Sequence, residues 1–273
     1  MEADRLQKPV RTLRKGLKSL PRDPAPEQVH KLRIGARHME SVAAALLPAD
    51  GKKARRLLKT IRPLRKAAGA VRDMDMLTAN ALKLAEAPGN DSLARLVKYL
   101  GATRQQNVAQ LLDAVEHRRK SARRRLKRFA RNVESELKGE ASGERAPELE
   151  GSVRAAAAKL HSKLSRWPVL SAANIHRFRL KIKELRSLLQ LEQDSDAGLL
   201  RALGSAKRKI GEWHDWQQLK EIASEVLNAY EDRGLLMDID QAVSRKLTQA
   251  LAASNALRKR YLKPNPMQRQ PSE

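Results

Sequence analysis

Several residue types are absent or scarce in this 273-residue chain, and each absence excludes a class of chemistry. There is no cysteine, which excludes disulfide bonds, cysteine-based zinc sites and thiol catalysis. Aromatic residues make up only 3%, which argues against a surface that stacks nucleic-acid bases on Phe, Tyr or Trp. No apolar run approaches the length of a membrane span, and the N-terminus has no apolar signal region. We therefore expect a cytoplasmic protein that does not associate with membranes.

Positive charge, by contrast, is abundant. The chain has 56 Lys and Arg residues against 31 Asp and Glu, a formal net charge of +25. Such a charge opposes compaction and attracts anions at long range. Nucleic acid, polyphosphate and anionic membrane are therefore the partner classes to compare. Hydrophobic residues make up 41%, enough for a folded core rather than wholesale disorder.

Apolar residues recur with a helical period along nearly the whole chain, and no segment has the alternation typical of a strand. We predict an all-α protein of eight helices, at about 3–20, 27–47, 51–86, 91–138, 152–166, 172–193, 197–229 and 238–262. Pro63 lies inside the third and should kink or break it.

The residues between the fourth and fifth helices suggest two halves. Residues 139–151 are acidic, small and aperiodic, which predicts a linker. The linker would separate a first four-helix half, 1–138, from a second, 152–263. The Pro-containing tail 264–273 is expected to be disordered.

A basic motif occurs once in each half. Residues 29–37 read V-H-K-L-R-I-G-A-R and residues 175–183 read I-H-R-F-R-L-K-I-K, with an offset of 146 residues. A second match pairs 69–77 with 211–219 at an offset of 142 residues, aligning Gly with Gly and Asp with Asp. Two collinear matches with nearly equal offsets indicate an internal duplication.

Each motif places a row of side chains on one helix face, because residues three or four positions apart are neighbours on a helix. We call these the motif rows: His30, Arg33 and Arg37 in the first half, and His176, Arg179, Lys183 and Arg186 in the second. Stacked cations repel one another, and an anion between them would remove that cost. One row could be an ordinary solvated face; two matched rows favour an anion site. Neither histidine has a His or carboxylate three or four positions further on, so we expect no metal site.

Other basic residues extend the candidate site. They are Lys59, Arg62, Arg65, Lys66, Arg72, Arg119, Arg123, Lys207, Arg208 and Arg258. The densest charge lies at 117–131, where nine of fifteen residues are Lys or Arg; alone, this run suggests nucleic acid or membrane. Gly69 and Gly211 are expected to permit close helix approach. The D-x-D at 73–75 and the E-x-E-x-K at 134–138 are expected to be accidental, because both fall on helices.

These motifs resemble the CHAD family, the conserved histidine α-helical domain. The resemblance rests on Val29-His30 with Arg33 and Arg37, on Gly69 with Arg72-Asp73, and on their counterparts Ile175-His176, Arg179, Lys183, Arg186, Gly211 and His214-Asp215. It covers about 5–263. The family implies two four-helix bundles related by pseudo-two-fold symmetry, with a central basic pore lined by the motif rows, and binding of inorganic polyphosphate there.

We therefore predict a non-enzymatic polyphosphate-binding protein without a cofactor. The resemblance describes a stand-alone helical domain, and polyphosphate-metabolising enzymes are a further class of partner. The first alternative is a nucleic-acid-binding helical protein, for which the charge suffices. The second is a polyphosphate phosphohydrolase, against which the lack of a carboxylate cluster for Mg²⁺ argues.

Overall fold

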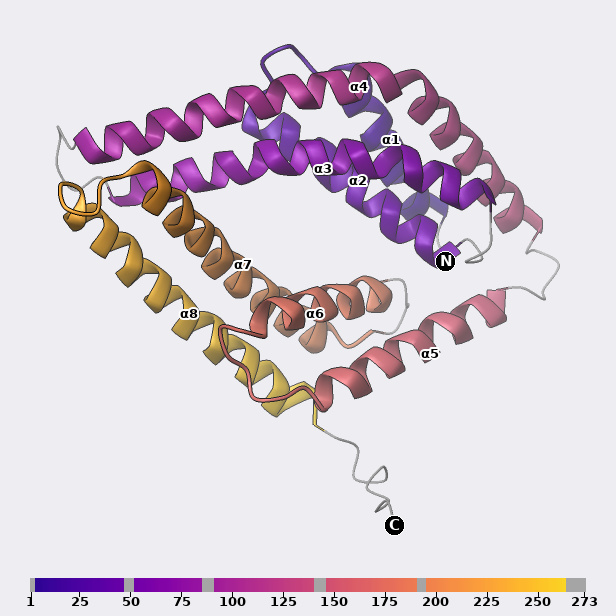
Figure 1. Cartoon of the computed structure of the whole chain (residues 1–273). Coiled ribbons are helices and arrows are strands. Elements are labelled where there is room, and N and C mark those ends of the chain that lie inside the picture. The colour runs from indigo at the N-terminus through magenta and orange to yellow at the C-terminus, as the bar shows by residue number, and fades with distance from the viewer. Residues whose placement is uncertain (1–2, 47–51, 85–90, 140–145, 191–194, 264–273) are drawn as a thin grey trace. The chain divides into compact units, whose positions relative to one another are not determined.

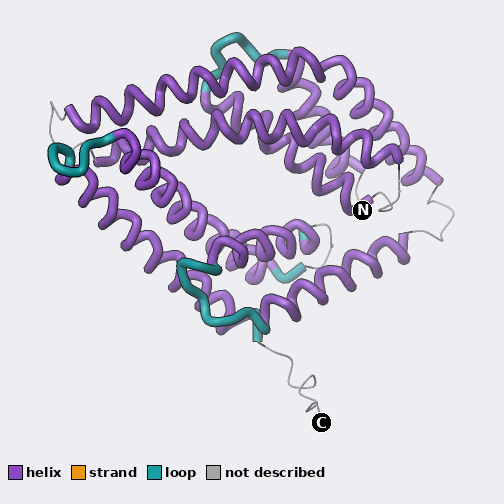
Figure 2. Tube along the Cα trace, viewed as in Figure 1, coloured by secondary structure: helices purple, strands orange, loops and turns teal. Residues whose placement is uncertain are grey.

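Every regular element in the described part of the chain is helical. The computed structural model describes residues 3–46, 52–84, 91–139, 146–190 and 195–263, and within them there is no strand (Figures 1 and 2). The helices are α1 (Ala3–Lys18), α2 (Pro26–Leu46), α3 (Lys52–Ala81), the short 3-10 helix η1 (Leu82–Leu84), α4 (Asp91–Gly139), α5 (Ala146–Ser165), α6 (Ile175–Leu189), α7 (Ala197–Val226) and α8 (Arg233–Tyr261). Across these ranges, no helix has the length and apolarity needed to cross a bilayer.

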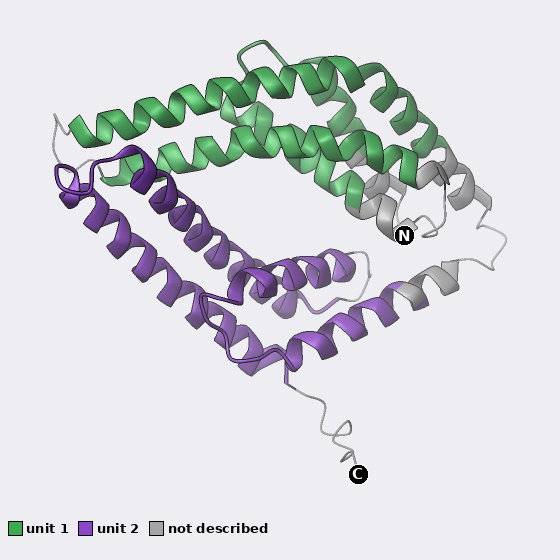
Figure 3. Cartoon of the chain, viewed as in Figure 1, with its two compact units in different colours: residues 1–146 green, residues 147–273 purple. Residues whose placement is uncertain are grey.

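The chain divides into two compact units (Figure 3). Unit 1 is Met1–Ala146 and contains α1 to α4; unit 2 is Pro147–Glu273 and contains α5 to α8. The boundary falls inside the predicted linker 139–151.

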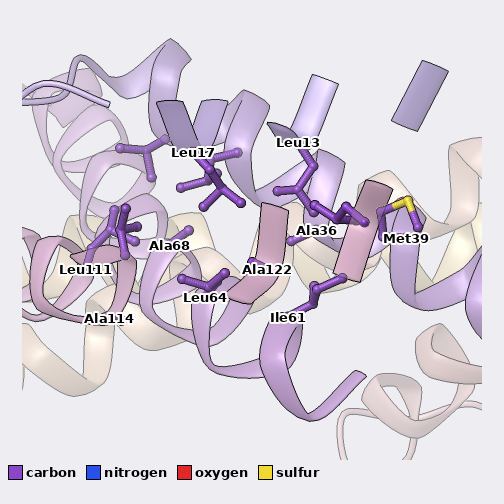
Figure 4. Packing of buried hydrophobic residues seen from close by; sticks show 14 of the residues in the cluster. Leu13, Leu17, Ala36, Met39, Ile61, Leu64, Ala68, Leu111, Ala114 and Ala122 are labelled. Carbon is purple, nitrogen blue, oxygen red and sulfur yellow. The ribbon is translucent and has the colours of Figure 1, made fainter. Parts of the chain in front are cut away.

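Unit 1 has a core of its own, to which all four of its helices contribute (Figure 4). On α2 four apolar residues, Val29, Leu32, Ala36 and Met39, are at most 1% exposed. These residues recur every three or four positions, so they line one side of the helix. The same spacing brings buried residues from α1, α3 and α4 against them, including Leu13, Leu17, Ile61, Leu64, Leu111 and Leu126.

Unit 2 repeats this construction on α6. Ile175, Phe178, Ile182 and Leu185 are buried, and α6 packs against α7, which in turn packs against α8. Phe178 also meets the ring of Trp167 edge-on, with centroids 5.6 Å apart, a favourable aromatic geometry.

Several helix bounds differ from the sequence prediction, four of them as follows. Six residues of the predicted linker, 146–151, belong to α5, since proline at position 147 is tolerated in a first turn and acidic residues favour it. Helix α6 begins at Ile175 rather than about 172, because the Asn174 side chain accepts from the Ser171 N–H and donates to the Val169 carbonyl, which holds a turn there. Helix α8 begins at residue 233, five residues early, and α3 ends at residue 81. Residues 140–145 and the predicted tail 264–273 lie outside the described residues.

Helix α3 is not interrupted at Pro63, which excludes the predicted break, whereas the alternative of a kink stays a prediction. Proline removes one backbone donor from a helix interior. Hydrogen bonds from side chains support the preceding turn: Thr60 donates to the Arg56 carbonyl at 2.9 Å. From α4, Arg125 donates to the same carbonyl and to the Thr60 hydroxyl. These contacts tie α3 to α4 beside the proline.

Candidate anion-binding clusters

The first motif row lies beside the buried face of α2. Its His30 is exposed, whereas Arg33 and Arg37 are half-buried where α2 packs on α3. A Cβ placed on Gly69 of α3 would lie 3.7 Å from Nε of Arg33. Arg33 therefore extends from α2 across the glycine of α3. We call His30, Arg33 and Arg37, with Arg72 of α3, cluster 1.

The arginines of cluster 1 act on the pKa of the His30 imidazole. Burial lowers the pKa of His30 below its ordinary value, and the positive charges of Arg72, Arg33 and Arg37 lower it further. The carboxylate of Glu27 acts in the opposite direction but does not cancel them. A group placed beside His30 therefore experiences a net excess of positive charge, which favours a bound anion.

The second row makes the corresponding contacts between α6 and α7. A Cβ on Gly211 would lie only 3.0 Å from Nη2 of Arg179, so Arg179 lies directly over this glycine. The rings of His176 and His214 are stacked, with centroids 4.7 Å apart and planes inclined by 32°. We call His176, Arg179, Lys183 and Arg186, with His214 of α7, cluster 2.

Both stacked imidazoles resist protonation. Burial and then the Arg179 charge lower the pKa of His176. The pKa of His214 is lowered by burial, then by His176 and Arg179, against a smaller raising effect of Glu221. Nδ1 of His176 is buried and has no hydrogen-bond partner among the described residues.

The two clusters differ at the last position of the row. In unit 2 this is Arg186, whose Nε lies 3.5 Å from the position of a Cβ on Gly204. The residue 146 positions earlier is Glu40, which binds Nε of Arg65 at 2.8 to 2.9 Å. The α7 counterpart of Arg65 is Lys207. A neutralised pair in unit 1 thus corresponds to two cations in unit 2.

Several predicted site residues have other surroundings. Lys59, Arg62, Lys66, Arg119, Arg123 and Arg208 are exposed and make no hydrogen bond or ion pair with another described residue. Arg258 donates to the Pro168 carbonyl at 3.1 Å and to the Trp167 carbonyl. It therefore anchors the segment after α5, a structural role that the sequence did not indicate.

Both acidic motifs lie on helices, the D-x-D on α3 and the E-x-E-x-K on α4. Asp75 is buried and accepts from Nε of Arg104 at 2.7 Å, with Arg72 at 3.8 Å. No group of three or more His, Asp or Glu residues that could hold a metal occurs among the residues described. The E-x-E-x-K segment lies within α4, as expected for an accidental match.

One residue of cluster 2, His214, and one residue of the first motif helix, Glu40, are not among the predicted site residues. His214 occupies the position of Arg72 in the second repeat, and that alignment could have identified it. Glu40 occupies the position of Arg186 in the first half. Because it is a carboxylate, it does not fit the pattern of cations that defines the motif rows.

Comparison with known proteins identifies the family. A search of curated proteins found no match. Among solved structures, the crystal structure of the CHAD domain from the plant Ricinus communis is similar, with a TM-score of 0.59 and 20% identity over 94% of this chain and 88% of that one. The sequence profile of the CHAD domain matches residues 4–224, a range that includes both motif rows and both glycine-containing segments. With its all-helical fold and its histidine rows in both units, the chain belongs to the CHAD family.

Proposed function

We propose that this protein binds inorganic polyphosphate, without hydrolysing it, through clusters 1 and 2. The observation that carries the proposal is that one arginine of each motif row lies over a glycine of the neighbouring helix, Arg33 over Gly69 and Arg179 over Gly211, which holds these cations where α2 packs on α3 and α6 packs on α7. The resemblance to the CHAD family supplies the ligand class. We also propose, from the family resemblance, that the two halves arose by internal duplication and that the two motif rows line a basic pore.

The geometry supports a chain of phosphates. Successive row residues stand about 5–6 Å apart along a helix, so several cations can pair with neighbouring phosphates of one polymer. Arginine suits this role because its planar guanidinium binds phosphate oxygens through two parallel hydrogen bonds. Packing of Arg33 and Arg179 over glycines limits the side-chain freedom lost on binding.

The hydrogen bonds and ion pairs within the protein reduce the set of residues that we propose as polyphosphate ligands. Arg65 is neutralised by Glu40, and Arg258 is held by two backbone carbonyls, so we leave both out. Arg119 and Arg123 belong to α4 and are likewise left out. The proposed ligands are the cations and imidazoles of the two clusters.

Titration with polyphosphates of graded length, with orthophosphate and duplex DNA as controls, tests the proposal. The variant with Arg33, Arg37, Arg179 and Lys183 changed to Ala, here called the row variant, should lose polyphosphate binding while its far-UV circular dichroism stays helical. A matched control changes four exposed cations of unit 2, Arg154, Lys159, Arg233 and Arg245, to Gln and should bind nearly normally. Unchanged polyphosphate affinity in the row variant would refute the proposed site.

The non-catalytic part of the proposal has its own test. Purified protein incubated with long-chain polyphosphate and Mg²⁺ should release no orthophosphate. Release above a no-protein blank would instead support the phosphohydrolase alternative.

A further inference from the structure

A second concentration of positive charge lies on α4, which carries neither motif row. Between residues 117 and 131 nine of fifteen residues are Lys or Arg, and none is Asp or Glu. Helix α4 packs on α1 and α3, and in this stretch it does so through the buried side chains of Ala122, Leu126 and Phe129. At about 100° per residue, most of the cations fall on the opposite side of the helix.

Five of these cations form what we call the α4 ridge: Lys120, Arg123, Arg124, Lys127 and Arg128. All five are exposed, and none makes a hydrogen bond or ion pair with another described residue. Their neighbour Arg125 behaves differently, because it is turned toward α3 and bonded there. The ridge therefore consists of charges that the fold of unit 1 does not use.

The spacing of charges along the ridge suits a contact with the phosphates of a nucleic-acid backbone. Its five charges occupy about 12 Å of helix axis, whereas double-stranded DNA carries a negative charge about every 1.7 Å of its own axis. An α-helix fits the major groove, which is about 12 Å wide. We propose that the α4 ridge is a docking surface for the phosphate backbone of double-stranded nucleic acid, independent of base sequence.

The composition of the segment offers few side chains that distinguish bases. Residues 117–131 contain no Asn or Gln to recognise adenine and no Asp or Glu to recognise cytosine, so the main base contacts left are those of Arg and Lys with guanine. Their single aromatic residue, Phe129, is 6% exposed, so it cannot stack on unpaired bases. A duplex held through its phosphates is therefore favoured over a single strand.

The burial of the apolar residues in this segment argues against an anionic membrane as the partner of the α4 ridge. A helix that lies on a bilayer inserts apolar side chains beside its basic face. The apolar residues of this segment, Ala122, Leu126 and Phe129, are instead buried in the core of unit 1. Within residues 117–131 no large hydrophobic side chain is exposed, and the exposed Tyr99 of α4 lies 21 positions before Lys120.

Fluorescence anisotropy of the full chain with a labelled duplex DNA of mixed sequence tests the proposal. The ridge variant changes Lys120, Arg124, Lys127 and Arg128 to Gln. At about 0.1 M salt its affinity should fall at least about tenfold, and the slope of log affinity against log salt should become shallower by about 3 to 4. The row variant should keep its affinity for the duplex, so a failure here is distinct from a failure of the polyphosphate proposal.

The unit 2 control described above removes the same charge from scattered exposed positions, and its affinity for the duplex should change less than about threefold. An equal loss in this control and in the ridge variant would overturn the proposal in favour of an effect of net charge. Full retention by the ridge variant would overturn it outright. Loss of polyphosphate binding with the duplex retained would assign the ridge to polyphosphate, and loss of binding only to phosphatidylserine vesicles would assign it to a membrane.

Discussion

The imidazoles of His30, His176 and His214 all have pKa values below the ordinary value of 6.5, with burial as the first cause in each. They are therefore mostly neutral at about pH 7. For such a group the unfolded chain takes up more protons than the folded one as the pH falls. Its contribution to stability is complete above the ordinary pKa and decreases as the pH falls toward the folded-state pKa.

This sign predicts how pH acts on the ligand-free protein. Its Tm should fall between about pH 7.5 and about pH 5.5, and the fall should be smaller in the variant with His176→Gln and His214→Gln. Saturating polyphosphate should reduce the fall in the wild type, because a bound anion favours protonated imidazole. Thermal unfolding followed by circular dichroism measures all of these. Parallel Tm profiles of wild type and variant would contradict the assignment to this histidine pair.

The two glycines under the arginines predict a graded response to alanine. Alanine favours a helix over glycine by about 0.5–1 kcal/mol. At Gly69 the new Cβ would lie at an ordinary distance, 3.7 Å, from Arg33, so Gly69→Ala should raise the free energy of unfolding. At Gly211 it would lie 3.0 Å from Arg179, so that side chain must shift and the gain should be smaller. Urea titrations of the two variants compare them, and a larger gain at Gly211 would disagree with this packing.

At the scale of elements, α2 and α6 carry related rows with different charge. Glu40 of α2 neutralises Arg65 of α3, whereas the same two positions hold Arg186 and Lys207 in unit 2. If both rows bind polyphosphate, unit 2 should attract it more strongly than unit 1.

The charge of Glu40 therefore predicts a gain of affinity on its removal. Glu40→Gln should raise polyphosphate affinity about two- to fivefold at low salt, since Arg65 is no longer neutralised. It should lower the free energy of unfolding by no more than about 1 kcal/mol, because the pair is partly exposed. Glu184→Gln is the matched control, since Glu184 pairs with Lys181 elsewhere on α6. An equal gain in both variants would point to net charge alone.

The helical periodicity of the sequence predicted the positions of the helices better than the side-chain contacts between them. The apolar row of α2 indicated both the helix and its buried side, because a period of 3.6 is a local property. Two of the helix starts differ from the prediction where turn or first-turn chemistry competes with that period, at Asn174 and at residue 147. Helix α3 continues through Pro63, and the contacts beside the proline come from Arg125, 62 positions away, which the local sequence could not indicate. The roles of Arg65 and Arg258 likewise depend on residues that only the fold brings near.

At the scale of the whole molecule, the two units have separate cores and different spectroscopic content. The buried cluster of unit 1 draws only on α1 to α4. All three tryptophans, Trp167, Trp213 and Trp216, lie in unit 2. Tryptophan fluorescence therefore reports unit 2 alone, whereas far-UV circular dichroism reports the helices of both.

Arg104 offers a way to weaken unit 1 selectively. From α4 it donates to Asp75 of α3 at 2.7 Å and to the Pro24 carbonyl at 2.8 Å, so it joins two helices and the turn before α2. Arg104→Ala would leave the Asp75 carboxylate, 5% exposed, with only Arg72 at 3.8 Å. Removing one partner of a buried ion pair costs about 3–5 kcal/mol, and the remaining arginine places the expected loss near the lower figure.

The resulting prediction concerns the cooperativity of the chain. In a urea titration of Arg104→Ala, circular dichroism should show an early transition that tryptophan fluorescence does not follow, because unit 1 unfolds while unit 2 keeps its core. Arg119→Ala, which removes an exposed arginine of the same helix, should leave both signals close to wild type. If the two signals instead move together to lower urea in Arg104→Ala, the units unfold as one cooperative body. That result would mean that each core depends on the other for its stability, despite being built from its own four helices.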